Sequence, residues 1–136
     1  MLYAIGLDAV EIKRFAQWHL FPQARLLRIF SEQEIAYCLS VSSKSAERFA
    51  VRFAAREALF KACSQAGFNN NIPFLRFCRC VEVMRTPQGV PYFQIAWDKI
   101  IGDKTVPELI ENIDILLSLT HTETTAIASI VMQKRV

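Results

Sequence analysis

Residues 44 to 66 contain neither glycine nor proline, are rich in alanine, and end at Gly67. Alanine and unbranched side chains favour the α-helix, and glycine is the residue that most often follows the end of one. The pattern predicts one long helix over about 44–66. Its alanines leave room for another backbone to approach closely, so the rest of the chain is expected to pack around this helix.

Charged residues interrupt the alanines of this helix in a regular way. Glu57 and Lys61 are four residues apart and share one face, and Arg48, Arg52 and Arg56 form an adjoining basic row. A carboxylate beside several cations is typical of sites that hold Mg²⁺ and phosphates together. The same pattern is also typical of a solvated helix with ion pairs between neighbouring turns, so a second feature is needed to indicate a site.

The N-terminus supplies that second feature. The apolar residues 2 to 7 lead directly into Asp8 and predict a buried strand over about 2–9, in which Gly6 permits close backbone approach. Asp8 stands where the strand gives way to a helix, a position from which a carboxylate reaches a cleft. It would equally suit the N-cap of that helix.

The remaining elements follow from turn and capping signals. Ser31 and Glu34 predict a capping box. We expect helices over about 11–19, 23–29 and 32–39, a turn at Phe21-Pro22, a loop over 69–73, strands over about 80–86 and 91–96 joined by a turn at 87–89, and a final hairpin of strands 113–120 and 124–133. Residues 97–112 fit either short helices or a long loop.

These elements predict an α+β fold with an antiparallel-rich sheet packed with the long helix. A chain of 136 residues, 52% of them apolar, is large enough for one core, so we expect a single domain over residues 1–136.

Charge and composition narrow the class of protein. A net charge of +3 is too small to indicate nucleic-acid binding, but the cations at Lys13, Arg14, Arg25 and Arg28 are bunched, which favours an anionic partner or simply keeps the domain soluble. No apolar run approaches the ~18 residues that span a bilayer, and the N-terminus lacks a signal-peptide pattern, so we expect a cytoplasmic protein without membrane insertion. Four cysteines without zinc-site spacing are expected to be reduced thiols.

Taken in order, several segments carry a family resemblance. They are Ile5 to Arg14, Arg28 to Glu34 with Tyr37-Cys38, Arg52 to Ala62, Gly89-Val90-Pro91, and Ser118-Leu119-Thr120-His121-Thr122 with Ala126 to Ala128. Their order and spacing through nearly the whole chain resemble the holo-[acyl-carrier-protein] synthases, the short bacterial type of 4'-phosphopantetheinyl transferase. A lone histidine such as His121 is otherwise more often structural than catalytic.

The resemblance implies transfer of 4'-phosphopantetheine from coenzyme A to a serine of apo acyl carrier protein, with release of adenosine 3',5'-bisphosphate and a place in fatty acid and lipid biosynthesis. It implies Asp8 and Glu57 as Mg²⁺ ligands, with Asp8, Glu57 and Lys61 as the catalytic set. Mg²⁺ is commonly held by one or two carboxylates plus substrate phosphates, which agrees with this pair. Glu57, Asp8 and a metal-bound water all remain candidates for the general base.

The resemblance also assigns binding roles. Arg52, Lys61, His121 and Thr122 match positions that contact the phosphates of coenzyme A, and Pro91 matches the position against the nucleotide base. Arg14, with Arg25, is implied to contact the acidic carrier protein. Members of this type are generally homotrimers with the active site between protomers.

The chain departs from the family pattern in three places. Arg56 stands where these enzymes usually carry lysine, and residues 64–77 and 97–112 look longer or more apolar than is usual. Two other classes use the same basic rows: a module that binds an acidic protein without catalysis, and a nucleic-acid-binding domain. Neither accounts for the paired acids Asp8 and Glu57.

Overall fold

The long helix predicted from the alanine-rich stretch is the centre of the fold. In the computed structural model, which describes residues 1–68, 71–102 and 108–135, helix α3 spans Ser45–Ala66. It ends at Gly67, which has a φ of 79°. The N–H groups of Gly67 and Phe68 donate to the carbonyls of Ser64 and Cys63, so the last turn is closed by a glycine cap. The predicted helix over 44–66 is confirmed to within one residue.

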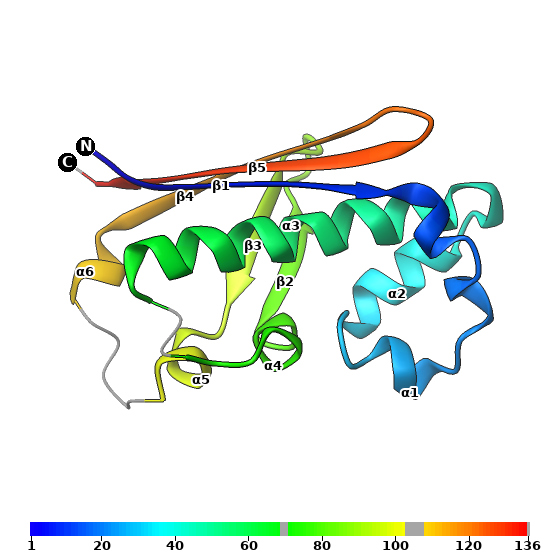
Figure 1. Cartoon of the computed structure of the whole chain (residues 1–136), viewed down its shortest axis with the longest axis horizontal. Coiled ribbons are helices and arrows are strands. Elements are labelled where there is room, and N and C mark those ends of the chain that lie inside the picture. The colour runs from blue at the N-terminus through cyan, green and yellow to red at the C-terminus, as the bar shows by residue number, and fades with distance from the viewer. Residues whose placement is uncertain (69–70, 103–107, 136) are drawn as a thin grey trace.

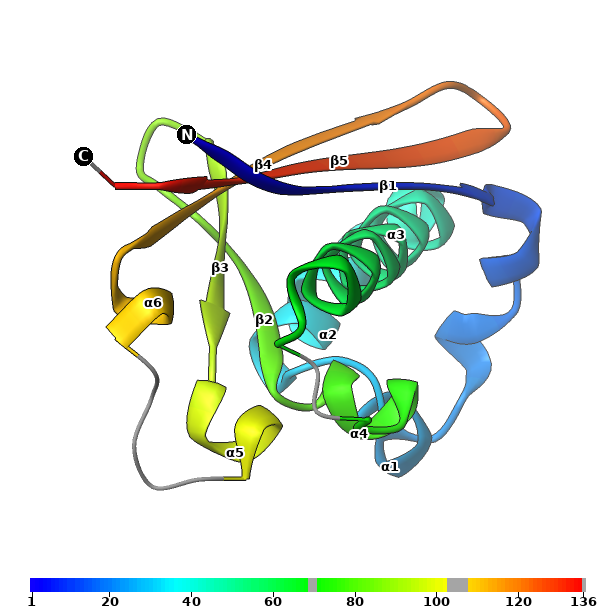
Figure 2. The ribbon, with the colours of Figure 1, turned by 60° about the vertical axis from the view of Figure 1, so that its left-hand side comes forward.

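A three-stranded antiparallel sheet covers one side of α3 (Figure 1). Its order is β1 (Leu2–Glu11), β5 (Thr125–Lys134) and β4 (Ile113–His121), so both chain ends lie on neighbouring strands. Asp8 lies opposite Ala128 of β5, and Ala128 lies opposite Leu119 of β4. The predicted N-terminal strand and the C-terminal hairpin are confirmed. The other face of this sheet is not covered by any described helix (Figures 1 and 2).

Small residues bring β1 and α3 into close contact. A Cβ atom placed on Gly6 would lie 2.0 Å from the carbonyl oxygen of Ala58, which no side chain could tolerate. Ala54, Ala58 and Ala62 are fully buried along the same helix. The absence of side-chain bulk at this contact fixes how closely Asp8, two residues beyond Gly6, approaches α3.

The two central strands form their own ladder, β2 (Val81–Arg85) with β3 (Pro91–Ile95) (Figure 2). Gly89 has a φ of 85° and donates its N–H to the Thr86 carbonyl, which closes the predicted turn. The described strands therefore form two antiparallel sheets rather than one, within the predicted α+β fold.

The segment between β1 and α3 is helical, as predicted, but in shorter pieces. Ser31 and Glu34 form the predicted capping box, with Glu34 N–H donating to Ser31 Oγ and Ser31 N–H donating to Glu34 Oε1. The helices here are η1 (Ile12–Phe15), η2 (Trp18–Leu20), α1 (Gln23–Leu26), α2 (Glu32–Leu39) and η3 (Ser42–Lys44).

Two helix predictions in this segment are wrong in detail. The α-helix expected over 11–19 is replaced by the two 3₁₀ turns η1 and η2, because β1 continues to Glu11 and the Ile12 N–H is bonded to the Thr124 carbonyl of the hairpin. The helix expected over 23–29 ends at Leu26. Around these turns, Trp18 packs against Phe15, Phe49 and Phe53, so aromatic packing rather than a continuous helix holds the segment.

Short helices occupy the two segments that look unusual in the sequence. Helix α4 spans Phe74–Cys78 after Pro73, where only a loop over 69–73 was expected to precede the strand. The described parts of the segment 97–112 form α5 (Trp97–Ile101) and α6 (Glu108–Glu111). Residues 69–70 and 103–107 lie outside the described residues. Among the described helices, none is both long enough and apolar enough to cross a membrane.

Candidate active site

Two carboxylates meet where β1 crosses α3. Asp8 is only 7% exposed, and Glu57, one residue before Ala58, lies against it. The close approach of Gly6 to Ala58 places both acids at this contact. The structure therefore brings together the two residues predicted to hold a metal ion.

The proximity of the two acids changes the chemistry of Glu57. Burial, then a hydrogen bond with the Asp8 side chain, and then the negative charge of Asp8 raise the pKa of Glu57, whereas the positive charges of Arg14 and Lys61 oppose the shift. The two carboxyl groups can share this hydrogen bond only when one of them is protonated, and with both ionised Asp8 Oδ2 has no hydrogen-bond partner among the described groups. Without that proton, two negative charges face each other and favour a bound cation.

Lys61 is the third member of this cluster. Its ammonium donates to Asp8 Oδ1 at 2.9 Å and to the Leu7 carbonyl at 3.1 Å. The alternative in which Lys61 pairs with Glu57 within the helix is therefore replaced by a contact across to β1. Lys61 remains more than half exposed, so one ammonium proton is available to an anion beside the carboxylates.

The donor set of this cluster suits Mg²⁺. Asp8 Oδ2 is buried and has no hydrogen-bond partner among the described groups, and Glu57 lies beside it. No group of three metal-ligating side chains occurs among the described residues. Two carboxylates without further protein ligands are typical of Mg²⁺ sites that are completed by water and substrate phosphates.

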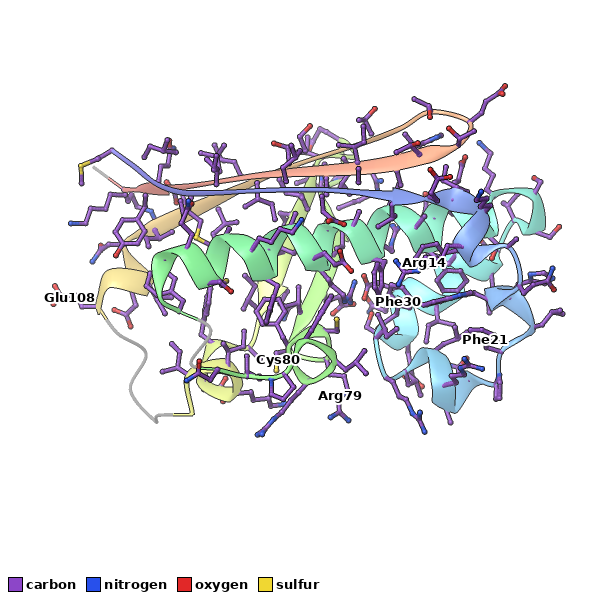
Figure 3. All side chains as sticks on the ribbon, viewed as in Figure 1. Arg14, Phe21, Phe30, Arg79, Cys80 and Glu108 are labelled. Carbon is purple, nitrogen blue, oxygen red and sulfur yellow. The ribbon has the colours of Figure 1, made fainter. Side chains whose placement is uncertain are left out.

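Arg14 and Arg25 both lie beside aromatic rings, and Arg14 is also close to Glu57. The guanidinium of Arg14, on η1, lies 5.0 Å from the centre of the Phe53 ring, and that of Arg25, on α1, lies 3.8 Å from the centre of the Phe21 ring. Arg14 and Phe21 lie at the same end of the molecule (Figure 3), and Arg25 belongs to α1, which follows Phe21 in the chain. Because Arg14 also lowers the pKa of Glu57, its charge reaches the carboxylate cluster as well as the surface.

A second cluster of charges lines a cleft of about 160 Å³ on another side of α3. Four cations and one carboxylate surround it, together with His121. The charged residues are Lys44, Glu47, Arg48, Arg52 and Arg85, and Tyr37, Val51, Leu119 and Thr120 complete the lining. A cleft with this excess of positive charge suits a ligand with several negative charges.

Arg52 is the buried member of this cleft. It is 4% exposed, its Nε has no hydrogen-bond partner among the described residues, and its Nη1 donates only a long bond of 3.3 Å to the Arg48 carbonyl. Burial lowers the pKa of Arg52. The ring of Tyr37 lies against both Arg48 and Arg52, at 4.0 and 4.5 Å from its centre. A buried cation with an unused donor is prepared to bind an anion.

The other predicted nucleotide contacts occupy the edge of this cluster. His121 Nδ1 lies 3.5 Å from Glu47 Oε2. Thr122 is not part of the cleft lining, and its Oγ1 accepts the N–H groups of Thr124 and Thr125, which shapes the hairpin turn. Pro91 pairs with Arg85 in the β2–β3 ladder, so it lies beside a residue of the cleft rather than in its lining.

The structure also shows what sequence reasoning missed. Lys44, Arg85 and Tyr37 join the cleft, and only the proximity of Lys44 to the start of α3 hinted at this in the sequence. Arg56 does not belong to the exposed basic row, because it is fully buried and pairs with Glu34. The row of Arg48, Arg52 and Arg56 is therefore not one ligand-binding surface.

The two clusters do not meet within one chain. Asp8 is on the edge strand β1, and His121 is on the opposite edge strand β4, with β5 between them. Val10 and His121 both pair with Ala126, so Asp8 and His121 are separated by at least two strand spacings, about 10 Å. Helix α3 packs against one face of this sheet (Figure 2). The carboxylates and the cationic cleft therefore lie at opposite edges of the sheet.

A further cleft, of about 410 Å³, lies between the α1–α2 connection and the β2–β3 ladder. Phe30, Arg79 and Cys80 line it (Figure 3), and it contains none of the predicted site residues. The four cysteines, predicted to be reduced thiols, are all free and buried, and burial raises the pKa of Cys63 to about 12, which disfavours a reactive thiolate there.

Comparison with known proteins gives matches over nearly the whole chain. The family described as the 4'-phosphopantetheinyl transferase superfamily matches residues 4–115. The holo-[acyl-carrier-protein] synthase of Koribacter versatilis is 35% identical, with 98% of this chain and 99% of that protein covered. That of Treponema denticola is 31% identical over 98% and 99% of the two chains.

Solved structures are similar over the same length. The acyl carrier protein synthase of Chronobacterium ammoniagenes in complex with coenzyme A has a TM-score of 0.72 and 26% identity, with 98% of each chain covered. The holo-[acyl-carrier-protein] synthase of Helicobacter pylori, also in complex with coenzyme A, has a TM-score of 0.67 and 27% identity, with 95% of this chain and 99% of that chain covered. The predicted fold is confirmed by these similarities.

Proposed function

This chain belongs to the 4'-phosphopantetheinyl transferase superfamily, and we propose that it transfers the 4'-phosphopantetheine group of coenzyme A to a serine hydroxyl of apo acyl carrier protein. The products would be holo acyl carrier protein and adenosine 3',5'-bisphosphate. Its similarity over nearly the whole chain is to holo-[acyl-carrier-protein] synthases, so the chain is an enzyme of this type.

The observation that carries the proposal is the cluster of Asp8, Glu57 and Lys61. A buried carboxylate with an unused oxygen, a second acid beside it and a cation bonded to the first match what a reaction at a pyrophosphate requires. Asp8 and Glu57 would hold Mg²⁺, which when bound neutralises the negative charge that develops on the leaving phosphate. The Lys61 ammonium donates to Asp8 and to the Leu7 carbonyl of β1, and its third N–H would bind a phosphate oxygen.

The nucleotide part of coenzyme A would occupy the cationic cleft around Arg52. Its unpartnered Nε and the neighbouring cations Lys44, Arg48 and Arg85 support an anion site there, with His121 at its edge. Pro91 is proposed to contact the base, because it lies opposite Arg85 in the ladder. Thr122 is proposed to contribute its remaining hydroxyl proton.

The carrier protein would dock at the end of the molecule that bears Arg14 and Arg25. Both arginines are exposed and lie over aromatic rings, which holds each planar cation in place for an acidic partner. Arg14 also reaches the charges around Glu57. A serine delivered at this surface would therefore arrive beside the carboxylate cluster.

We also propose a homotrimer in which each active site combines the carboxylate cluster of one protomer with the cationic cleft of a neighbour. The placement of these clusters at opposite edges of the sheet, with β5 between β1 and β4, supports this arrangement. The face of the β1–β5–β4 sheet opposite α3 exposes Ile5, Leu7 and Leu116, which suits burial against other copies. A cytoplasmic location is proposed as well, in agreement with four free thiols.

The test is mass spectrometry of an apo acyl carrier protein incubated with this protein, coenzyme A and Mg²⁺. We expect the carrier to gain one phosphopantetheine group, and EDTA to prevent the gain. Asp8→Asn should abolish it. Asp114→Asn, a matched change at an acid bonded to Arg135 on β4, should not. A folded protein that leaves a competent carrier unmodified would refute the proposal and favour a non-catalytic module that binds acidic proteins.

A further inference from the structure

Two buried arginines on α3 lie near one buried carboxylate. Arg56 is fully buried, Arg52 is 4% exposed, and Glu34 of α2 is 3% exposed. Arg52 and Glu34 line the same cleft of about 240 Å³, together with Tyr37 and Arg85. Glu82 also lines this cleft, but it is only half-buried and accepts a hydrogen bond from Ser31. The partners of the buried Glu34 therefore decide whether Arg52 has a buried carboxylate partner.

Glu34 is committed to Arg56. Arg56 Nη1 donates to Glu34 Oε2 at 2.8 Å, and Arg56 Nη2 donates to Glu34 Oε1, so the two groups form a two-pronged pair. The remaining lone pairs of Glu34 accept the N–H groups of Ser31 and Val83. Both oxygens of Glu34 therefore already have partners.

The other donors of Arg56 fix its orientation. They reach three backbone carbonyls, those of Cys78 at 3.2 Å, Val81 at 2.7 Å and Arg52 at 3.3 Å. A planar guanidinium has five donors in one fork, so all of its hydrogen-bonding capacity is used. A lysine at this position would have three donors on one nitrogen and would not hold both Glu34 oxygens and these carbonyls together.

Arg52, unlike Arg56, has a buried N–H donor that is not used. Its Nε has no partner among the described residues, although it is buried one helical turn from Arg56 and shares a cleft with Glu34. If Glu34 were released, Arg52 would be the nearby buried cation able to bind it. With Glu34 held by Arg56, Arg52 has no carboxylate partner among the described residues.

We propose that Arg56 is a positioning residue for the anion site: by holding both oxygens of Glu34, it keeps Glu34 from pairing with Arg52 and leaves the Arg52 guanidinium available to an anionic group of coenzyme A. The identity of the ligand rests on the proposed function. Arg56 is fully buried and cannot contact a ligand itself, so it contributes to the anion site only through Glu34.

The test compares Arg56→Gln, Glu34→Gln/Arg56→Gln and Arg52→Gln/Arg56→Gln with Arg52→Gln and the unchanged protein. For each, the Kd of adenosine 3',5'-bisphosphate is measured by calorimetry, and KM for coenzyme A and kcat are measured in the transfer assay. Arg56→Gln should raise Kd and KM about tenfold, because Glu34 then captures Arg52. The value of kcat should change little, since Asp8, Glu57 and Lys61 lie on the other side of α3.

The double variants distinguish a role of Arg56 in positioning Glu34 from a role in the stability of the fold alone. In Glu34→Gln/Arg56→Gln the competing charge is gone, so Kd should return to within about threefold of the original. In the Arg52→Gln background, Arg56→Gln should cause no further loss, since the residue on which it acts is absent. Equal losses in both backgrounds would overturn the proposal.

Controls account for loss of folding. Ile100→Ala destabilises the core at α5 far from the cleft and should leave Kd unchanged, as should Arg79→Lys at an exposed arginine. If Arg56→Gln fails to fold, Arg56→Lys takes its place: a raised Kd that Glu34→Gln reverses supports the proposal, and an unchanged Kd in folded Arg56→Lys refutes it. Because bisphosphate binding needs no carrier protein, a failure of transfer in the unchanged protein would refute the proposed function without deciding this point.

Discussion

The ammonium of Lys61 lies 2.9 Å from Asp8 Oδ1, joining residues that are 53 positions apart in the sequence. This bond links the long helix to the first strand at the point where Glu57 also meets Asp8. It keeps one Asp8 oxygen engaged and leaves the other, Oδ2, without a partner among the described groups. The cluster thus presents an open carboxylate oxygen and an exposed cation side by side.

Replacing Lys61 with alanine should reduce transfer without unfolding the protein. Lys61 is more than half exposed, so its removal leaves no cavity, but the pyrophosphate loses a cation. We expect kcat/KM for coenzyme A to fall by about 100-fold, with little change in Tm, as measured by steady-state assay and thermal unfolding. Lys13→Ala, at an exposed lysine of η1, provides the control. Unchanged kinetics in Lys61→Ala would remove the lysine from the site.

The raised pKa of Glu57 predicts a pH dependence. Its causes, in order, are burial, the hydrogen bond with Asp8 and the charge of Asp8. Since the folded protein favours protonated Glu57, the stability that Glu57 contributes is present below its unfolded pKa and is lost as pH rises through the folded pKa. Mg²⁺ requires the deprotonated form, so its affinity should rise over the same interval.

This dependence can be measured by NMR titration of the Glu57 carboxyl carbon. Asp8→Asn removes the charge of Asp8 and should lower the pKa of Glu57 toward its ordinary value. Calorimetry should show weaker Mg²⁺ binding by the same variant, because one ligand has been lost. A pKa of Glu57 that does not move when Asp8 is changed would show that burial alone causes the shift.

Gly6→Ala should be strongly destabilising. The new Cβ would lie 2.0 Å from the Ala58 carbonyl oxygen, so β1 and α3 must separate. We expect a loss of about 2 kcal/mol or more in the free energy of unfolding, measured by urea denaturation. Transfer should fall further than folding explains, because the same shift separates Asp8 from Glu57. Ala9→Ser, at an exposed position of the same strand, is the control, and equal stability of the two variants would contradict the contact.

The features predicted correctly from the sequence are mostly local ones. The cap at Gly67, the capping box of Ser31 and Glu34 and the turn at Gly89 each depend on residues within a few positions of one another. The pairing of Asp8 with Glu57 required the family resemblance as well, since strand and helix patterns alone do not say where two elements cross. The two 3₁₀ turns were missed because the bond from Ile12 to Thr124 and the packing of Trp18 on Phe49 and Phe53 both involve residues distant in the sequence.

The burial of Arg56 was not predictable from charge periodicity. An arginine in a basic row is expected at the surface, and its burial depends on Glu34, 22 residues away, and on carbonyls of a different segment. Not all residues of the cationic cleft could be predicted from the sequence, for the same reason. Arg85 and Lys44 belong to separate elements, and only the fold places both beside Arg52.

The proposed trimer predicts that a charge on the open sheet face will dissociate it. Leu7 is 62% exposed on β1, on the face away from α3, and Leu7→Lys should give monomers in sedimentation experiments because a buried lysine would lack a partner. Leu75→Lys, at a residue 58% exposed on α4, should not. A trimer that persists in Leu7→Lys would place the contact elsewhere.

A sharper version of this prediction uses two inactive chains. Asp8→Asn removes the carboxylate cluster of a protomer, and Arg52→Gln removes the anion site of its cleft. If each active site combines one cluster from each of two neighbours, then dissociating and reassembling the two variants together should restore part of the activity, because some interfaces pair an intact carboxylate cluster with an intact cleft. The carrier-modification assay measures the recovery. Activity that stays absent in mixed trimers, when mass spectrometry confirms the mixing, would show that both clusters must belong to one chain.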